Sequence, residues 1–468
     1  MKRIILLLYT VLCTLYSFGE LKYVFYVIGD GMGTNQILAA EMYRAALNGD
    51  PYGRVQTRMS AFPYMGYIST HSANSGVTDS SAAGTTLATG VKTNNGTIGL
   101  DAHGDTLTTI AEELKAQGWG VALLTSVAID HATPAAFYGH VKDRHYYYEI
   151  GQQLCASNFD FFGGAGFHQP QGKHNDQKNL FRLTEQAGYT IAHGMEEAVR
   201  IQNSDVSKMI LIQEGDDQET EGEPSTNFPY AIDRKPGDLT LPQVTSVAIP
   251  FMAERHDRFF MMIEGGMIDY AGHGDDAATS IGEVWDMDEA LQQVYEFYLA
   301  HPDETLIVVT SDHETGGMGL GIGGKYVLHL DVLQHQKCSA WILSDIFSDL
   351  FKNNAKPSWA QVKQIYREQL GFWDTVKIKA EEERELKELY EKACKGSAKN
   401  DENLYKSVNA LGKKGITLIN KKARVGWTSS GHTAHAVPVF AIGVNAELFS
   451  GWKDNTDLVP TIRKAIEK

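Results

Sequence analysis

The sequence predicts an α/β fold: a doubly wound, mainly parallel central β-sheet with helices on both faces and an additional helical insertion. Short runs rich in β-branched and aromatic residues alternate along the chain with segments of helical periodicity. This alternation is typical of parallel strands joined by helical crossovers. The chain has 468 residues, 43% hydrophobic and 21% charged, which is the balance of an ordinary globular protein. Disorder as the main state is therefore not expected.

The expected strands are short apolar runs of the kind that a parallel sheet buries on both faces. They cover residues 23–28, 121–125, 209–212, 259–263, 306–310 and 437–442. Helical periodicity is clearest over residues 106–117 and 283–299. In sheets of this kind the functional residues gather at the carboxyl ends of the strands.

Residues 325–420 differ in character from the rest of the chain. Amphipathic helical patterns cover residues 359–370 and the charge-rich segment 376–395. We interpret residues 325–420 as a mainly helical insertion, with residues 20–324 and 421–468 forming the catalytic domain around it. The insertion contains no cluster of candidate ligands. We therefore expect it to cover the site or a partner surface and to perform no chemistry itself.

The N-terminus has the layout of a secretory signal peptide. Lys2 and Arg3 precede an apolar run over residues 4–15, and the small residues Ser17 and Gly19 follow it. The apolar run is shorter than the ~20 residues needed to span a bilayer, so no stable membrane span is expected. We expect residues 1–19 to be removed and the mature protein to be secreted or periplasmic.

Charge and cysteine content narrow the class of protein further. The 42 basic and 58 acidic residues give a formal net charge of −16, and a surface of this sign repels nucleic acid. Outside the signal segment the cysteines are Cys155, Cys338 and Cys394, which allow at most one internal disulfide. The fold must therefore depend on its core, and on any bound metals, for its stability.

Carboxylates and imidazoles follow four of the expected strands. They are Asp30 after the first run, Asp130 and His131 after the second, Glu264 after the fourth, and Asp312 and His313 after the fifth. Because the carboxyl ends of parallel strands share one edge of a sheet, we expect these side chains to converge. A structural protein has little use for such a concentration of like charges, so the pattern favours a functional site.

The small-residue segment 77–90 contains the candidate nucleophile, Ser80. Small residues after Ser80 let a helix begin close to other backbone, and a helix N-terminus attracts anions such as phosphate. The alternative is that Ser80 only caps this helix, as serines at such positions commonly do. No catalytic triad is evident around Ser80, so metal coordination is the expected activator of its hydroxyl.

Two further segments offer metal ligands. The first runs from Glu264 through Asp269 to His273, and the second contains Asp312 and His313. Ligand sets that mix nitrogen and oxygen suit zinc, whereas sets of carboxylate and hydroxyl oxygens suit magnesium. A single histidine is more often a surface or core residue than a ligand. Two separate Asp and His pairings beside glycines nevertheless favour the metal-binding interpretation.

These motifs resemble those of the alkaline phosphatase family and occur in the family's order. The matching segments are Asp79-Ser80, the spacing from Glu264 to His273, Asp312-His313 and Gly431-His432-Thr433, within a resemblance that covers residues 23–317 and resumes near residue 427. The resemblance implies a hydrolase of small-molecule phosphate monoesters that acts through a phosphoserine intermediate. It also implies two zinc ions, one magnesium ion and, as is usual in the family, a possible homodimer.

The resemblance also assigns roles to single residues. One zinc would be held by Asp269, His273 and His432, and the other by Asp30, Asp312 and His313 with the Ser80 oxygen. The protein ligands of the magnesium would be Asp30, Thr133 and Glu264. Arg144 would clamp phosphate, because a planar guanidinium can hold two oxygens at once.

Three more residues are expected beside the ligands: Asp79, His131 and Tyr270. His131 stands where some bacterial relatives have Asp, and Tyr270 stands where relatives commonly have Lys, His or Trp. These departures leave the identity of the third metal and the pH optimum open. His435 lies three residues beyond His432, but His432 is the preferred ligand because it has the Gly-His-Thr context.

Other function classes are weaker. Ala82 and Gly84 stand where sulfatases have Pro and Arg, and Arg144 would crowd the second ester group of a phosphodiester. A non-catalytic secreted metal- or phosphate-binding protein would show a missing nucleophile or a broken ligand set, and neither is present. A nucleotide-binding oxidoreductase based on residues 29–33 is disfavoured, because the glycine spacing is not that of a dinucleotide-binding turn.

Overall fold

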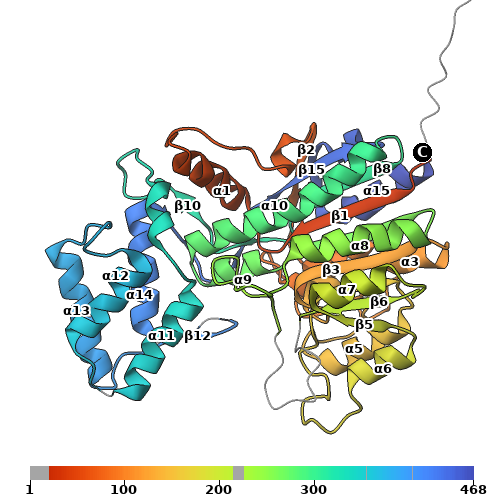
Figure 1. Ribbon diagram of the computed structural model, residues 1–468. Helices are drawn as coiled ribbons and strands as arrows, with labels where there is room; N and C mark the ends of the chain where they lie inside the picture. Colours follow the sequence, from red (N-terminus) through yellow and green to blue (C-terminus); the bar gives the residue numbers. More distant parts are fainter. Residues whose placement is uncertain (1–19, 214–225, 355, 403) are drawn as a thin grey trace, which may run out of the picture.

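The computed structural model describes residues 20–213, 226–354, 356–402 and 404–468 (Figure 1). The segment expected to be a signal peptide lies outside these residues. Among the described residues, ten strands form one sheet in the order β16-β2-β15-β8-β1-β7-β3-β4-β6-β5. Their bounds are β1 (Tyr23–Gly29), β2 (Tyr64–Ser69), β3 (Gly120–Ala128), β4 (Phe161–Ala165), β5 (Thr190–His193), β6 (Met209–Ile212), β7 (Phe259–Gly265), β8 (Thr305–Thr310), β15 (Val437–Gly443) and β16 (Gly451–Asp454).

The sheet is mainly parallel, as the sequence predicts. β1 pairs in parallel with β7 and β8, and β3, β4, β6 and β5 continue the parallel arrangement on one side. β15 is antiparallel to both β8 and β2. All six expected strands are present. The sequence did not predict β2, β4, β5 and β16, which are short or contain glycine and so carry a weak strand signal.

Helices cover both faces of the sheet, which confirms the doubly wound arrangement. Side chains of a strand point alternately to its two faces, and in β1 Phe25 and Val27 join one hydrophobic cluster while Tyr26 and Ile28 join another. The first cluster contains residues of α1 (Thr34–Leu47), α8 (Leu241–Arg255) and α10 (Ala277–Ala300). The second contains residues of α2 (Ser80–Thr89), α3 (Ile110–Ala116), α5 (Tyr147–Ala156), α6 (Leu180–Gln186) and α15 (Leu458–Glu467).

Capping side chains set the helix starts that periodicity alone misplaced. The helix expected from residue 106 begins at Ile110, because Thr109 and Glu112 form a capping box in which each side chain accepts the other's backbone N–H. The helix expected from residue 283 begins earlier, at Ala277, where Asp276 accepts the Thr279 N–H.

The residues from 330 to 423, called here the helical segment, form a group beside one end of the sheet (Figure 1). Its apolar side chains, such as Phe347, Tyr366 and Leu411, belong to the same hydrophobic cluster as Phe25 of the sheet. The helical segment therefore shares a continuous hydrophobic core with one face of the sheet. Its elements are η2 (Leu330–His335), α11 (Ala340–Asn353), α12 (Trp359–Leu370), α13 (Ala380–Cys394), β11 (Asp401–Glu402), β12 (Ser407–Val408) and α14 (Ala410–Ala423).

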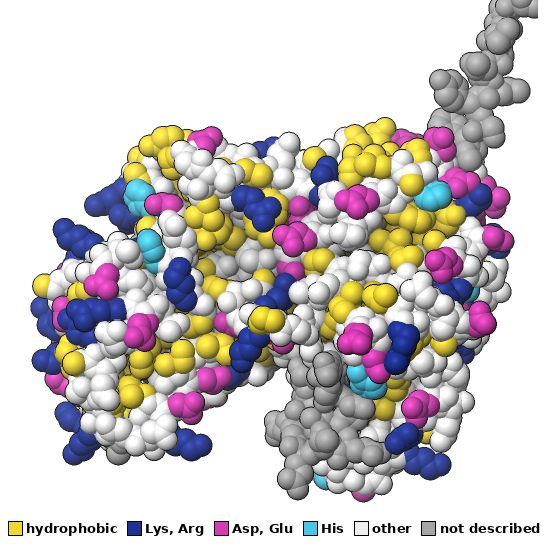
Figure 2. Space-filling view, in the orientation of Figure 1, with side chains coloured by type: hydrophobic (Ala, Val, Ile, Leu, Met, Phe, Trp, Pro, Cys, Tyr) yellow, Lys and Arg dark blue, Asp and Glu magenta, His cyan; other side chains and the backbone are white. Residues whose placement is uncertain are grey.

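The outer surface of the helical segment mixes both signs of charge. Figure 2 shows basic and acidic side chains close together over these helices. Several are paired, as Lys363 is with Glu383 at 2.8 Å and Lys414 with Glu385 at 2.7 Å. Pairs at a solvent-accessible surface contribute little to stability even where one side chain is half-buried, so the segment is held mainly by its apolar face.

Neither a disulfide nor a membrane helix contributes to the described structure. Cys155, Cys338 and Cys394 are all free, so the stability of the fold rests on its hydrophobic clusters, as expected from the cysteine count. Among the described residues, the helices are too short or too polar to cross a bilayer.

Candidate metal centre

Three groups of acidic and histidine side chains meet at the carboxyl edge of the sheet. Asp30 follows β1, Asp312 follows β8, and the register of β7 places Glu264 beside Ile28 of β1. Within each group, one potential ligand atom of every residue lies within 4.8 Å of the others. The groups are Asp269 with His273 and His432, Asp30 with Asp312 and His313, and Asp30 with His131 and Glu264.

The first group combines a helix with a short strand pair. Asp269 and His273 lie one turn apart in α9 (Met267–His273), and His432 lies in β14 (His432–Thr433), which pairs with β9 (Glu314–Thr315). The Asp269 Oδ1 atom is 3.4 Å from His273 Nε2 and 3.5 Å from His432 Nε2. The two Nε2 atoms are 3.2 Å apart.

Backbone carbonyls fix the orientation of both imidazoles. His273 Nδ1 is 2.6 Å from the Ser430 carbonyl oxygen, and His432 Nδ1 is 2.8 Å from that of Thr78. A carbonyl oxygen can only accept, so each Nδ1 carries the proton, and each Nε2 has a lone pair free for a cation placed between the imidazoles and Asp269. His435, by contrast, has a side chain that is 64% exposed and lies outside the group, which supports the choice of His432.

The second group is fully buried and touches the candidate nucleophile. His313 Nε2 is 3.4 Å from Asp30 Oδ1, 3.1 Å from Asp312 Oδ2 and 3.2 Å from Ser80 Oγ. The turn after β1 needs glycine at Gly31, which has a φ of 71° and whose Cβ would lie 2.8 Å from the Asp269 Cα. Asp30 is thereby held close to the first group.

Ser80 begins α2 and does not cap it. The N-cap is Asp79, whose Oδ1 accepts the Ala82 N–H at 3.0 Å. The helix therefore does not need the Ser80 hydroxyl as its cap. The small residues after Ser80 allow a close approach. A Cβ at Gly84 would lie 3.1 Å from Ala136 Cβ, where α2 meets α4 (Ala132–Ala135).

The third group differs from the ligand set implied by the family resemblance. Thr133 Oγ1 lies 3.4 Å from Asp30 Oδ2, and the Thr125 hydroxyl donates to Glu264 Oε2. The structure also brings the His131 imidazole into the group, a residue that the sequence placed only beside the ligands. The group thus offers carboxylate and hydroxyl oxygens and one nitrogen.

Burial without compensation makes these groups candidate cation sites. Asp30 Oδ1, Asp312 Oδ2, Glu264 Oε1 and His131 Nδ1 are buried, and the described residues offer them no hydrogen-bond partner. Burial, followed by the charges of neighbouring carboxylates such as Asp312, raises the pKa of Asp30 well above its usual range. Burial also raises the pKa of Glu264 to about 8. Cations of the right size would remove both penalties, so the side chains fit bound metals.

Burial disfavours the charged form of both His432 and His313, but the net shifts of their pKa values are opposite because their neighbours differ. Burial, and then the neighbouring His313, lowers the pKa of His432 to about 4, which keeps it neutral as a ligand must be. Burial also opposes the charged form of His313, but Asp312 outweighs it and the pKa of His313 is raised. Burial alone would raise the pKa of Asp269, but His273 and His432 outweigh it and the pKa is lowered.

Arg144 lies beside the nucleophile helix. Its Nη1 is 3.4 Å from Asp79 Oδ2 and its Nη2 is 3.1 Å from His131 Nε2, and its backbone N–H donates to the Gly96 carbonyl oxygen at 2.8 Å. Burial, and then the charge of Arg144, lowers the pKa of His131 well below its usual value. The guanidinium is thus anchored next to the N-terminus of α2, where an anion would bind.

One residue at the centre was missed by sequence reasoning. Tyr405, in the loop between β11 and β12, donates its hydroxyl to Asp269 Oδ2 at 2.9 Å. Its ring stacks on Tyr270 with centroids 3.6 Å apart and planes 19° apart. Tyr405 stands in a segment without a motif, and only tertiary packing brings it to Asp269.

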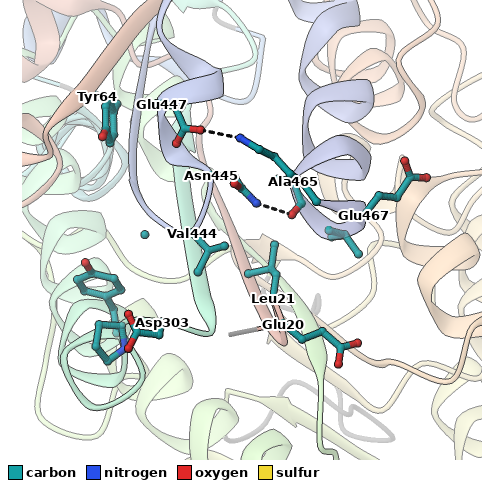
Figure 3. A pocket seen from close by; sticks show the side chains of 14 residues that line it. Glu20, Leu21, Tyr64, Asp303, Val444, Asn445, Glu447, Ala465 and Glu467 are labelled. Atoms are coloured by element: carbon teal, nitrogen blue, oxygen red, sulfur yellow. Dashed lines mark hydrogen bonds and ion pairs between the residues drawn. The ribbon is translucent and has the colours of Figure 1, made fainter. Parts of the chain in front are cut away.

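A cavity of ≈ 920 Å³ lies at the other end of the strands (Figure 3). It is lined by Leu21 before β1, by Val444 and Asn445 after β15, and by Ala465 of α15. Because Asp30 follows the opposite end of β1, this cavity is separate from the three groups. Its lining contains none of the residues that form the metal centre.

Comparison with protein-family models matches residues 21–468 to the family described as alkaline phosphatase. Alkaline phosphatase 4 of Bacillus subtilis (strain 168) is 31% identical over 459 residues, which cover 96% of this chain and 89% of that protein. The repressible alkaline phosphatase of Saccharomyces cerevisiae (strain ATCC 204508 / S288c) is 29% identical over 457 residues, with coverage of 90% and 75%.

Solved structures agree with this match. The cold-active alkaline phosphatase of the psychrophile Shewanella sp. has a TM-score of 0.78 at 27% identity and covers 95% of this chain and 100% of its own. The alkaline phosphatase of Thermus thermophilus has a TM-score of 0.75 at 26% identity, with coverage of 96% and 92%.

Proposed function

This chain belongs to the alkaline phosphatase family of phosphomonoester hydrolases, and from that premise we propose that its reaction passes through a covalent phosphoserine at Ser80. The family is metal-dependent. We propose zinc at the two mixed nitrogen and oxygen groups, which are Asp269 with His273 and His432, and Asp30 with Asp312 and His313. When bound, the cations would neutralise the attacking and leaving oxygens and lower the pKa of a nearby hydroxyl or water.

The third group is proposed to hold magnesium. Asp30, Glu264 and the Thr133 hydroxyl supply the oxygen ligands that magnesium prefers. The nearness of His131 adds a nitrogen that also suits zinc, so the choice of metal depends on whether this imidazole turns toward the cation. Metal analysis of the His131→Asp variant, which offers oxygen in place of nitrogen, would test this. We expect the magnesium content to rise.

The chain's own residues can carry the phosphoryl transfer. Ser80 Oγ lies at the N-terminus of α2, where backbone N–H groups and the helix dipole favour the negative phosphate. Arg144, anchored between Asp79 and His131, is proposed to turn its guanidinium to two phosphate oxygens. Substrate would thus be oriented with phosphorus near Ser80.

The reaction is proposed in two displacements. The Ser80 oxygen forms a bond to phosphorus as it loses its proton, and the bond from phosphorus to the ester oxygen breaks, releasing the alcohol. Water then attacks the same phosphorus, and the bond to Ser80 breaks, which releases phosphate and restores the hydroxyl. Each step transfers one phosphoryl group, so the products are one alcohol and one phosphate.

The observation that carries this proposal is the 3.2 Å contact between Ser80 Oγ and His313 Nε2 within a buried ligand group. The test is Ser80→Ala assayed on a chromogenic phosphate monoester, with metal content measured in parallel. We expect turnover to fall at least about 10³-fold while the metals are retained. Ser246→Ala is the matched control, because the Ser246 hydroxyl only bonds the Gln243 carbonyl oxygen within α8.

Wild-type turnover by the Ser80→Ala variant would overturn the nucleophile assignment. Parallel assays on a phosphate diester and a sulfate ester test the related hydrolase classes, and we expect the monoester to be preferred. A chain that binds metal and phosphate yet turns over none of the three esters would instead be a binding protein.

We propose further that the protein is secreted or periplasmic and that residues 325–420 form an insertion that reaches over the site. The first proposal rests on the layout of residues 1–19, and the second on the contact from Tyr405 to Asp269. A homodimer remains the family expectation, which sedimentation of the purified protein would test.

A further inference from the structure

The hairpin formed by β11 and β12 reaches from the helical segment to the metal centre. Tyr405 stands in its loop, 136 positions along the chain from Asp269, and donates its hydroxyl to the Oδ2 atom of that carboxylate. The Tyr405 side chain is partly buried and packs against the small hydrophobic cluster that contains Tyr270 of α9. A residue from outside the sheet thus contacts a proposed zinc ligand directly.

Hydrogen bonds hold the Asp269 carboxylate at both of its oxygens. Oδ1 accepts the Thr315 hydroxyl and is the oxygen that faces His273 and His432. Oδ2 accepts the Tyr405 hydroxyl at 2.9 Å. Without the second bond one hydrogen bond, from Thr315, would remain on the carboxylate, which would then rotate more freely about its Cβ–Cγ bond.

The Tyr405 ring is itself held in place. It stacks on Tyr270, which adjoins Asp269 in α9, and its ring meets that of His273 edge-on at 5.3 Å. The hairpin is tied to the helical segment by Lys406, whose Nζ is 2.7 Å from Asp345 of α11. Further support comes from the Asn409 N–H, which donates to the Ser344 hydroxyl at 2.7 Å.

We propose that Tyr405 is a positioning residue, which orients the Asp269 carboxylate toward the metal held with His273 and His432 and couples that metal to the helical segment. This inference rests on the proposed function only in assigning a cation to that group. Partners of metal ligands commonly change metal affinity about 10–100-fold when they are removed, and the loss of one phenol hydroxyl should fall in this range.

The test compares two Tyr→Phe variants of the full-length holoenzyme. Tyr405→Phe removes the hydroxyl that bonds Asp269 and keeps the stacking ring. Tyr366→Phe removes a buried phenol hydroxyl of the same segment, which donates to the Leu411 carbonyl oxygen at 2.8 Å. Zinc release to a chelating dye is measured for each variant with magnesium in excess.

We expect Tyr405→Phe to lose one zinc about 10–100-fold more readily than wild type, and Tyr366→Phe to release zinc as wild type does. Excess zinc should restore the kcat of Tyr405→Phe, because the defect lies in retaining the metal. The double variant Tyr405→Phe/His432→Ala should release no more zinc than His432→Ala alone, which assigns the lost zinc to this group.

Zinc release from Tyr405→Phe at the wild-type rate would overturn the proposal. Equal losses in Tyr405→Phe and Tyr366→Phe would overturn it as well, because they would indicate a general weakening of the segment. The release of zinc to the dye can be measured without any substrate turnover. A wild-type protein that hydrolyses no phosphate monoester would therefore refute the proposed function while leaving the zinc comparison intact.

Discussion

The carboxyl edge of the sheet and the helical segment reach the metal centre in different ways. At the sheet edge, residues such as Asp30 and Glu264 arrive because a strand ends or runs beside its neighbour, and strand register fixes their spacing. The helical segment supplies Tyr405 from a loop, and only packing between helices places it. Groups placed by register follow from local sequence, whereas groups placed by docking depend on the whole fold.

Removing the metals should produce the largest effect, and it acts on the sheet edge. The buried carboxylates Asp30, Asp312 and Glu264 lack partners for some of their oxygens, so their charges would stand uncompensated. We expect chelation to abolish turnover and to lower the free energy of unfolding by about 4 kcal/mol for each cation removed, as for a ligand present at 1,000 times its Kd. Hydrogen exchange with and without chelator would measure where protection is lost.

The same chelation should leave most of the helical segment protected. Its core residues, such as Phe347 and Leu411, belong to a hydrophobic cluster and to none of the three ligand groups. Equal loss of protection in α12 and α14 would contradict the distinction between the two regions.

A core substitution in the helical segment should have the next largest effect. Phe347 is fully buried and its ring lies 4.9 Å from that of Tyr366. Phe347→Ala should therefore lower the free energy of unfolding by about 3–5 kcal/mol, measured by denaturant titration. The folded fraction should keep its kcat, since the change lies away from Ser80. A loss of kcat as complete as that caused by chelation would show that the two regions cannot be separated.

The last expected effect is confined to the pH dependence of stability, and it arises at a buried acid outside the metal centre. Glu283 of α10 accepts the Ala231 N–H at 2.7 Å, and burial raises its pKa to about 8 from an ordinary value of 4.5. Between these values the folded protein keeps the proton that the unfolded chain releases, so stability should fall as pH rises from 4.5 to 8.

Glu283→Gln keeps the acceptor for the Ala231 N–H and cannot ionise. The difference in melting temperature between wild type and Glu283→Gln should therefore grow through this pH window in favour of the variant. Parallel curves for the two proteins would show that Glu283 ionises normally in the folded state.

Local sequence predicted the parts of this molecule that depend on local rules. The six apolar strands, and ligand candidates such as Asp312 and His313, follow from alternation and strand ends. β4 was not predicted, because its two glycines weaken the strand signal. α3 begins four residues after the predicted residue 106, because Thr109 caps it. Ser80 followed from the small residues after it, but His432 came from the family resemblance, since no periodicity connects it to Asp269.

Tyr405 could not be predicted, and the reason is physical. Most of its neighbours in sequence are polar and carry no periodic pattern, and its position depends on the stack with Tyr270 and on the ion pair of Lys406 with Asp345. The inclusion of His131 in the third group was similarly hidden, because its approach to Glu264 depends on how β3 and β7 pair.

The position of His432 has a consequence for the newly made chain. The imidazole comes from β14, after the helical segment, and its partner strand β9 lies more than a hundred positions earlier. The new chain therefore cannot complete the group around Asp269 until its last part has folded back onto β9. A chain cut short before β14 would keep Asp269 and His273 but lack the third side chain of their group.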